Sequence, residues 1–485
     1  MKKIYLLTLV LGLATTSCND WFDVIPRTSV YEEDLYKNET GFQQVLTGLY
    51  IGMGQESLYG KETSFGMTDV VSGIYHIPKT SNNAYKYALQ YNYEYSSTKG
   101  TITNIWNTAY NIIANANELL RNAGIRQDVA PQETAENTES NAFASGQTRN
   151  IICGEALALR AYLHLDLVRM FGMSPQQNAD KPAIPYVTVL QKNITPQSSV
   201  KEVMQSVITD LLQAEQLLRD ADPIVKGNPT LSDTYYKPVS RHAHLNYYAV
   251  CGLLARAYQY EGNDEEAGKW AEKVITSNAF SWTKTSALNN GDYVGTSELV
   301  FGLFIRNMKD QAAPYFRYNT ENENASALMP ISEATYNEYF GANDKRRKGF
   351  LMFQGSYLSQ KFVVTESDVA DSLSVQHWMP MLRLSEMYYI ATESLLAANN
   401  VDDAADELNL ARKAKGLKAV AYASAAEVRE ELNKEYFREF MSEGQLFYYI
   451  KRRNQPNLIA TQFKVDFVFP LPENEYTYGN RQANK

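Results

Sequence analysis

The chain has 485 residues and a formal net charge of −9, and 44% of its residues are hydrophobic. This length allows one large domain or two to three small ones. The acidic balance argues against a nucleic-acid partner, because phosphate binding requires clustered Lys and Arg, and the basic runs "DKRRKG" and "YYIKRRN" are short. Tyrosine is frequent, with 34 Tyr against 5 Trp, and its ring combines an apolar face with a hydroxyl.

The first residues predict an exported, lipid-anchored protein. Two lysines precede a mostly apolar run from Ile4 to Ala14, which is shorter than the about 20 residues of a spanning helix but typical of a secretory signal. Small residues and then Cys18 follow. In bacteria this order resembles the lipoprotein signal, in which the cysteine becomes the first residue and carries acyl chains. We expect cleavage of residues 1–17 and a lipid anchor on Cys18; the alternative is an ordinary secretory signal with an incidental cysteine.

Helical periodicity dominates the rest of the chain. We expect single helices over 40–52, 103–123, 157–172, 200–219 and 426–443. The segment "LALRAYLHLDLVRMFG" (157–172) also alternates in the manner of a strand. Its length and its few β-branched residues favour a helix that is buried on most sides.

Two segments are typical of helix–turn–helix units. In "NYYAVCGLLARAYQYEGNDEEAGKWAEKVITSN", Gly262 and Asn263 separate two apolar stripes. In "RLSEMYYIATESLLAANNVDDAADELNLARKAKGL", Asn399 and Asn400 make the turn, and Gly416 ends the second helix. Paired helices of about 34 residues are the tetratricopeptide pattern. The sequence therefore predicts a mostly α fold with a tetratricopeptide-like helix-pair scaffold.

Long polar stretches interrupt this scaffold, at 53–100, 124–148 and 281–380. Loops of that length in a compact domain are usually functional or disordered. The segment "YALQYNYEY" (87–95) alternates, which predicts a short strand pair laid on the helices. We expect a single domain over 18–485 that carries these three stretches as insertions.

Little in the sequence indicates catalysis. Cys153 and Cys251 lie in apolar helical patterns, and we interpret them as buried small hydrophobes; a disulfide between them stays open. His242 and His244 are two positions apart, so they would lie on different helix faces, and no metal site is expected there. No catalytic motif such as His-Glu-x-x-His or Gly-x-Ser-x-Gly occurs. We expect neither an enzyme nor a cofactor.

A series of weak motifs occurs in a specific order along nearly the whole chain. They are "GFQQVLTGLY", "NIWNTAYNIIANANELL", "GEALALRAYLHLDLVRMFG", "SELVFGL", "MLRLSEMYYIATESL" followed by "ADELNLARKAKGL", "REFMSEGQLFYYIKR" and "FVFPLPENE". Together with the start that ends at Cys18, they resemble the SusD/RagB family of outer-membrane nutrient-binding lipoproteins. The resemblance implies tetratricopeptide-like helix pairs with an irregular, partly β, ligand-facing half. It also implies the outer face of the outer membrane, a SusC-type TonB-dependent barrel as partner, and a ligand that is usually a glycan and in some relatives a peptide.

Two loops have the mixture of side chains that sugar binding requires. A sugar ring has an apolar C–H face, which an aromatic ring can cover, and a rim of hydroxyls, which polar side chains can bind. The loop "SGIYHIPKTSNNAYKY" offers Tyr75, His76, Asn82, Asn83 and Tyr85, and "FIRNMKDQAAPYFRYN" offers Arg306, Asn307, Tyr315, Phe316 and Tyr318. The alternative is that these aromatic side chains only pin long loops to the helices.

Four of the five tryptophans are expected away from the ligand, and the place of Trp282 stays open. Trp106, Trp270 and Trp378 lie in or beside helical patterns and are expected in the core, and Trp21 is expected to dock the tether. The predicted function is non-catalytic capture of oligosaccharide at the outer membrane and its delivery to the barrel transporter. Two alternatives stay open: peptide capture on the same scaffold, and a helical-repeat adaptor in an envelope complex.

Overall fold

A computed structural model describes most of the chain. The described residues are 35–77, 82–125, 142–191, 193–228, 230–231, 239–319, 324–364, 375–458, 461 and 463–485. The predicted signal segment, Cys18, Trp21 and most of 124–148 lie outside them. Within the described part, no helix is long and apolar enough to cross a membrane.

The predicted helices are confirmed. Most of their ends lie within three residues of the expected positions, but the helix expected from 157 begins at Gly146. The long helices are α3 (Glu39–Met53), α5 (Ser96–Asn122), α6 (Gly146–Phe171), α8 (Val200–Ala221), α9 (Tyr247–Glu261), α10 (Asp264–Ile275), α14 (Leu384–Ala397), α15 (Val401–Ala414), α16 (Ala425–Phe440) and α17 (Gln445–Arg452). Short helices are α4 (Met67–Val71), α7 (Pro175–Asn178), α11 (Thr285–Asn289), α12 (Met308–Phe316), α13 (Glu333–Tyr339) and α18 (Glu473–Thr477). The helix α5 begins seven residues earlier than the expected 103.

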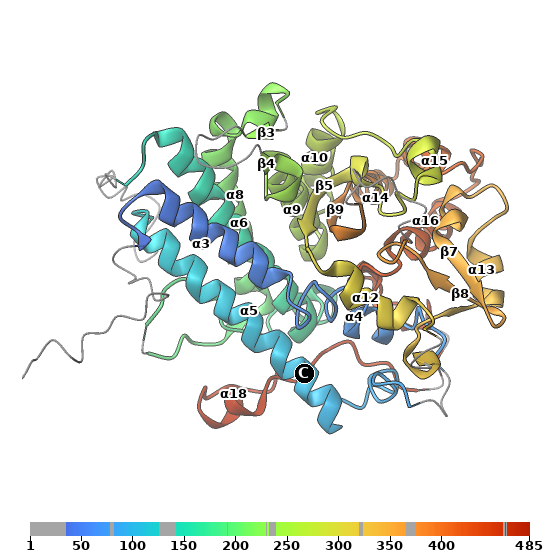
Figure 1. Ribbon diagram of the computed structural model, residues 1–485, viewed down its shortest axis with the longest axis horizontal. Helices are drawn as coiled ribbons and strands as arrows, with labels where there is room; N and C mark the ends of the chain where they lie inside the picture. Colours follow the sequence, from blue (N-terminus) through green and yellow to red (C-terminus); the bar gives the residue numbers. More distant parts are fainter. Residues whose placement is uncertain are drawn as a thin grey trace, which may run out of the picture.

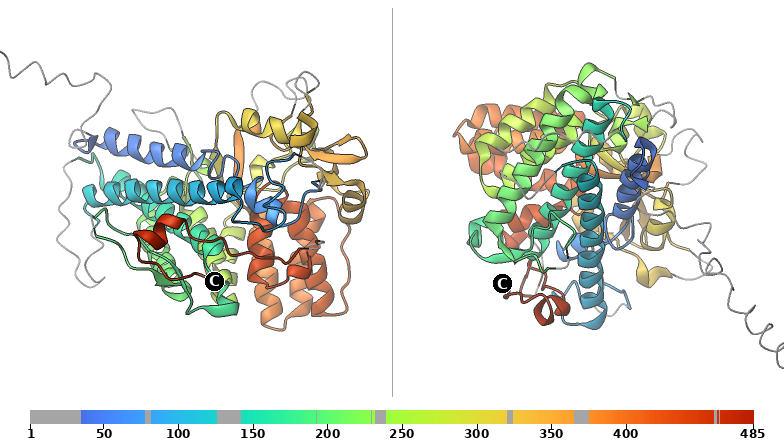
Figure 2. Two further views of the ribbon diagram at one scale, coloured as in Figure 1. Left: turned by 90° about the horizontal axis from the view of Figure 1, so that it is seen from below. Right: turned by 90° about the vertical axis from the view of Figure 1, so that its left-hand side faces the viewer.

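The long helices form one continuous stack in chain order (Figures 1 and 2). From α3 to α10 each long helix packs on the next, and α10 then packs directly on α14. The long segment between α10 and α14 therefore leaves the stack and returns to it without breaking it. This arrangement confirms a mostly α, tetratricopeptide-like scaffold with a loop-rich half.

The turns of the two helix pairs form as their sequences predict. Gly262 has φ +97°, in the left-handed region, and the Asn263 side chain accepts a hydrogen bond from the backbone N–H of Glu266. In the second pair Asn399 has φ +60°, and the Asn400 side chain caps α15. A glycine or asparagine in the left-handed conformation ends a helix, and an asparagine N-cap begins the next one. Both signals are local, so the sequence is enough to predict these turns.

The strands are short and lie mainly in the loop-rich half. They are β1 (Pro182–Ile184) with β2 (Ser198–Ser199), β3 (Thr230–Leu231) with β4 (Val239–Ser240), β5 (Leu299–Phe304) with β9 (Trp378–Arg383), and β6 (Ile331–Ser332), β7 (Phe350–Phe353) and β8 (Ser356–Ser359) in the order β6-β8-β7. In the antiparallel β5–β9 pair, Phe304 lies opposite Trp378 and Leu299 opposite Arg383.

The strand pair predicted in "YALQYNYEY" is wrong, because this segment forms a series of turns. The backbone N–H of Leu89 donates to Tyr85, the N–H of Asn92 donates to Tyr87, and Tyr91 has φ +56°. Tyr93 is buried against Phe469. The alternating tyrosines therefore reflect local turns and packing on the C-terminal segment.

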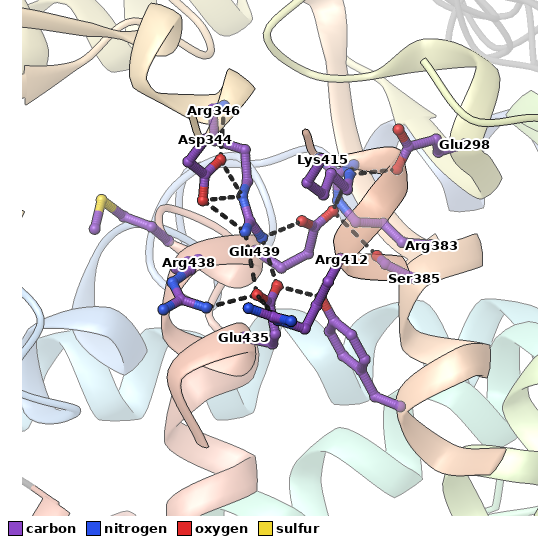
Figure 3. A network of polar contacts seen from close by, with 12 residues as sticks. Glu298, Asp344, Arg346, Arg383, Ser385, Arg412, Lys415, Glu435, Arg438 and Glu439 are labelled. Carbon is purple, nitrogen blue, oxygen red and sulfur yellow. Dashed lines mark hydrogen bonds and ion pairs between the residues drawn. The ribbon is translucent and has the colours of Figure 1, made fainter. Parts of the chain in front are cut away.

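A buried ion network joins the loop-rich half to the C-terminal helices (Figure 3). Arg346, in the short 3-10 helix η6 (Lys345–Gly349), contacts Glu435 and Glu439 of α16 at 2.9 and 3.0 Å. Lys415, just after α15, contacts Glu439 at 2.7 Å and Glu298 at 2.6 Å. The network thus fastens the segment between α10 and α14 by charged contacts.

Candidate functional site

The structure brings the two predicted loops together beside α12. The Asn83 side chain donates hydrogen bonds to the carbonyls of Ser326 and Ala327, each at 3.2 Å. The backbone N–H of His76 donates to the carbonyl of Pro330 at 2.7 Å. The rings of Tyr85 and Tyr315 have centroids 6.3 Å apart. The two loops therefore form one continuous surface, although they are far apart in the sequence.

Four of the candidate ligand residues lie in the core: Tyr75 and Tyr85, and also Asn83 and Phe316, which are 5% and 1% exposed. Tyr75 is 5% exposed, and its hydroxyl lies 3.3 Å from an Asp69 carboxylate oxygen and 3.3 Å from the Ser442 hydroxyl. Tyr85 is 6% exposed and donates to the Glu62 carboxylate at 3.0 Å. Neither ring has a free face for a sugar in this structure. Both residues therefore fit the alternative interpretation, in which the aromatic side chains hold the loop against the helices.

The hydroxyls of Tyr75 and Tyr85 bind two buried carboxylates, those of Asp69 and Glu62. Asp69 accepts hydrogen bonds from the backbone N–H groups of Ser442 and Gly444, at 2.7 and 2.9 Å, and so ties α4 to the turn before α17. Burial raises the pKa of Asp69 to about 8, although these N–H donors oppose the shift. Burial also raises the pKa of Glu62, against the attraction of Lys61. Both carboxylates therefore hold the loop in place through buried hydrogen bonds.

The other candidate residues reach the surface. His76, Asn82, Arg306 and Asn307 are exposed. Tyr315 and Tyr318 are half-buried: the Tyr315 ring lies beside Lys61, whose ammonium is 5.8 Å from the ring centroid, and the Tyr318 ring packs on Phe353 of β7 at 4.7 Å. Burial raises the pKa of Tyr315 above its ordinary value.

An aromatic cluster that the sequence did not reveal lies at the open end of the β5–β9 pair. It consists of Phe304, His377 and Trp378, and the Phe304 ring centroid is 5.4 Å from each of the other two. Phe304 is 47% exposed. Trp270 and Trp378 are both half-buried and pack against the core from its edge, so the prediction that they lie in the core is wrong; Trp106 is buried as expected.

Exposed polar residues directly follow this aromatic cluster in the chain. Arg306 and Asn307 follow Phe304 by two and three positions, and the backbone N–H of Ile305 donates to the carbonyl of His377 at 2.7 Å. The Nδ1 atom of His377 is buried without a hydrogen-bond partner among the described residues. Exposed aromatic faces beside a guanidinium, an amide and an imidazole suit a ligand with apolar faces and many hydroxyls.

A second candidate is a cavity of about 50 Å³ beside the ion network, and six of the eighteen residues that line it are cationic. Its cationic lining residues are Lys345, Arg346, Lys361, Arg383, Lys415 and Arg438. Five of these six pair with carboxylates, and Lys345 donates to the carbonyl of Ala414 at 3.2 Å. Because these charges are already compensated within the protein, we assign the cavity to the structural network.

Two further kinds of site, a metal cluster and a disulfide, can be checked in the described residues. The described residues contain no group of three or more His, Cys, Asp or Glu that could hold a metal ion. Cys153 and Cys251 are buried free thiols, so the disulfide that the sequence left open is not formed. Burial raises the pKa of both thiols to about 12, which leaves them protonated and unreactive.

Comparison with protein families decides the relationship. A family model described as "Starch-binding associating with outer membrane" matches residues 20–259, and the model of the SusD family matches residues 257–483. The chain belongs to the SusD/RagB family. The SusD-like protein P2 of Formosa agariphila is 26% identical over 280 residues, which are 58% of this chain and 47% of that protein. The chain therefore spans about half the length of this curated relative.

Solved structures of SusD proteins confirm the fold. A SusD superfamily protein from Bacteroides thetaiotaomicron has a TM-score of 0.71 at 20% identity, over 92% of this chain and 100% of that one. The surface glycan-binding protein A of the same organism, solved in complex with laminarihexaose, has a TM-score of 0.65 at 16% identity, over 92% of this chain and 99% of that one.

Proposed function

We propose that the protein captures oligosaccharide at the outer membrane, without catalysis, and delivers it to a SusC-type TonB-dependent barrel. The observation that carries the proposal is the exposed Phe304 ring packed on the half-buried Trp378 ring, with the exposed Arg306 and Asn307 two and three positions further along the chain. The family, and a relative of the same fold that was solved with laminarihexaose, support a glycan as ligand.

The proposed site runs along α12. Its first end is the aromatic cluster with Arg306 and Asn307, and its second end holds the half-buried rings of Tyr315 and Tyr318. His76 and Asn82 border this second end, because their loop packs on the segment after α12. An aromatic ring covers the C–H face of a sugar, and the exposed guanidinium and amides bind its hydroxyls.

The mature protein in this proposal is a single domain over 18–485, and residues 1–17 are a signal that is removed. Acyl chains on Cys18 would hold it to the membrane, since each buried CH₂ contributes about 0.8 kcal/mol and two or more chains anchor stably. The anchor leaves the protein at the membrane surface, where a bound glycan can pass to a barrel.

Calorimetric titration of the chain from Asn19 onward against plant, host and microbial oligosaccharides tests the proposal. We expect saturable binding of one glycan class, weakened about tenfold or more by Phe304→Ala or Trp378→Ala, because truncation of a central aromatic contact commonly costs at least 1.4 kcal/mol. The matched control is Tyr478→Ala, which removes a ring that is 75% exposed elsewhere on the surface.

The outcomes separate the alternatives. Tight binding of peptides with no glycan response would select peptide capture on the same scaffold. Absence of any ligand, together with copurification of several envelope proteins that is indifferent to the Phe304 and Trp378 variants, would select the adaptor. Equal loss in the Tyr478 control would show that the aromatic cluster is not the site.

A further inference from the structure

A groove of about 520 Å³ lies between α3 and α5. The two helices run side by side in all three views (Figures 1 and 2). Leu49, Gly52 and Ile112 form its apolar floor, and a Cβ atom on Gly52 would lie 3.0 Å from the Ile112 side chain. Gly48 leaves the groove open, because a Cβ atom there would meet nothing within 4 Å. Ligand sites typically have volumes of about 300–1,000 Å³.

This groove carries no charge. All eleven residues that line it are uncharged, although 21% of the chain is charged. The whole of α3 holds one charged residue, Glu39, and the first 22 residues of α5 hold only Lys99. The exposed faces of α10 ("DEEAGKWAEKVI") and α15 ("VDDAADELNLARKA") are by contrast rich in charge. A helix face that only contacts water does not need to lack charged side chains. An uncharged groove also offers no ion pair to a charged ligand.

Amide side chains recur along one wall of the groove. Asn107, Asn111 and Asn115 are exposed on α5 at successive turns, about 6 Å apart along the helix axis. Each amide can both donate and accept hydrogen bonds, as a sugar hydroxyl does. The spacing is close to the length of one residue in an extended glycan chain. Opposite this wall Ile51 is 69% exposed and offers an apolar surface to C–H groups.

The amides at the two ends of the groove differ in their partners. Asn115 donates to the carbonyl of Asn111 at 2.8 Å, which orients it along the helix. The side chains of Asn107 and Gln55 have no hydrogen-bond partner within the part of the chain that the structure describes. These two residues lie at the end of the groove that is formed by the C-terminus of α3. Their hydrogen-bond donors and acceptors are available to a ligand there.

The groove also leads toward the aromatic cluster. Gln55 lies at its end, and the neighbouring Gly54 approaches Ile305, where an added Cβ atom would be 3.2 Å from the side chain. Ile305 directly follows Phe304. The end of the groove at Gln55 therefore lies close to the C-terminal end of β5, the strand that carries Phe304.

We infer that the α3–α5 groove is an extension site for an extended, uncharged oligosaccharide whose other end lies at the aromatic cluster. This inference rests on the proposed function, and it adds two properties: selection for chain length and selection against charged glycans. A sugar chain presents C–H faces to Ile51 and Ile112 and hydroxyls to the row of asparagines. Short glycans would bind at the aromatic cluster alone.

The test compares long and short probes in the chain from Asn19 onward. The probes are laminarihexaose, maltohexaose, xylohexaose and mannohexaose, each beside its disaccharide. Gly48→Leu fills the groove with a better helix former at an open position. The matched control is Thr47→Leu, at the neighbouring exposed position, which does not line the groove. Thermal melting checks that both variants fold.

We expect at least one hexasaccharide to bind about tenfold more weakly to Gly48→Leu than to Thr47→Leu, while its disaccharide changes less than about twofold. Equal hexasaccharide affinities in the two variants, with loss in Phe304→Ala, would overturn the groove and leave the proposed function standing. Binding of charged glycans in place of all four neutral hexasaccharides would also overturn it. If no glycan of any kind binds the folded protein, the proposed function fails as well.

Discussion

Removal of Arg346 should test whether the ion network in Figure 3 holds the loop-rich half to the helices. Its guanidinium binds Asp344 through two nitrogens, at 2.9 and 2.8 Å, and Glu435 and Glu439 at 2.9 and 3.0 Å. All three carboxylates are buried. Arg346→Met keeps much of the apolar stem and removes the charge, so the change isolates these contacts.

The cost should fall mainly on Asp344. Without Arg346, Glu435 keeps Arg438 at 2.6 Å and Glu439 keeps Lys415 at 2.7 Å. Asp344 keeps only the backbone N–H of residue 346 among the described contacts. Loss of one partner from a buried ion pair costs on the order of 3 to 5 kcal/mol, because the other charge stays desolvated. The Asp344→Asn change should therefore recover at least about 1 kcal/mol in the Arg346→Met background.

Urea unfolding of the chain from Asn19 measures this cost as a change in midpoint at constant slope. Fluorescence also reports on the network, because the Trp282 ring lies 5.6 Å from the Lys415 ammonium. The matched control is Lys434→Met, which removes an exposed pair with Glu430 on α16 and should cost no more than about 0.5 kcal/mol. If Arg346→Met lowers the free energy of unfolding no more than this control does, the network does not hold the loop-rich half to the helices.

Three further changes have definite expected results. Burial acts to raise the pKa of Glu155, but Arg241, His244 and the hydrogen bond from Tyr50 together lower it to about 2 from 4.5. This carboxylate therefore stabilises the fold above about pH 4.5 and loses that effect as the pH falls through 2; Glu155→Gln should flatten stability over this interval in acid titrations. The thiols of Cys153 and Cys251 should resist Ellman's reagent in the folded chain and react after unfolding, and rapid native labelling would contradict their burial. Cys18→Ala should release the protein from the membrane fraction, and unchanged retention would refute the lipid anchor.

The helical scaffold could be predicted because its signals are local. A left-handed Gly262 followed by the capping Asn263 marks a turn within a few residues, and the same holds for Asn399 and Asn400. Apolar stripes three and four residues apart identify the buried face of each helix. Even the ambiguous segment over 157–172 could be assigned, since its length exceeded that of ordinary strands.

The site could be predicted only in part, because burial in a loop depends on distant partners. Nothing near Tyr75 in the sequence indicates that its hydroxyl meets Asp69 and Ser442. The aromatic cluster requires the β5–β9 register, which places Phe304 opposite Trp378 across a long intervening segment. The same register leaves Trp378 half-buried at the end of the strand pair. The helix-like pattern of the sequence around it predicted a place in the core.

The arrangement of the helices explains how such a site can vary while the fold is retained. Because α10 packs directly on α14, the segment between them contributes little to the continuity of the stack. Its attachment depends on a few buried charges, chiefly Arg346 and Lys415 against α16, together with the β5–β9 pair. The side chains of Phe304 and Arg306 make none of these charged contacts, and both are exposed. Substitution there should change which ligand is bound with little effect on stability, whereas substitution of the anchoring charges should do the reverse.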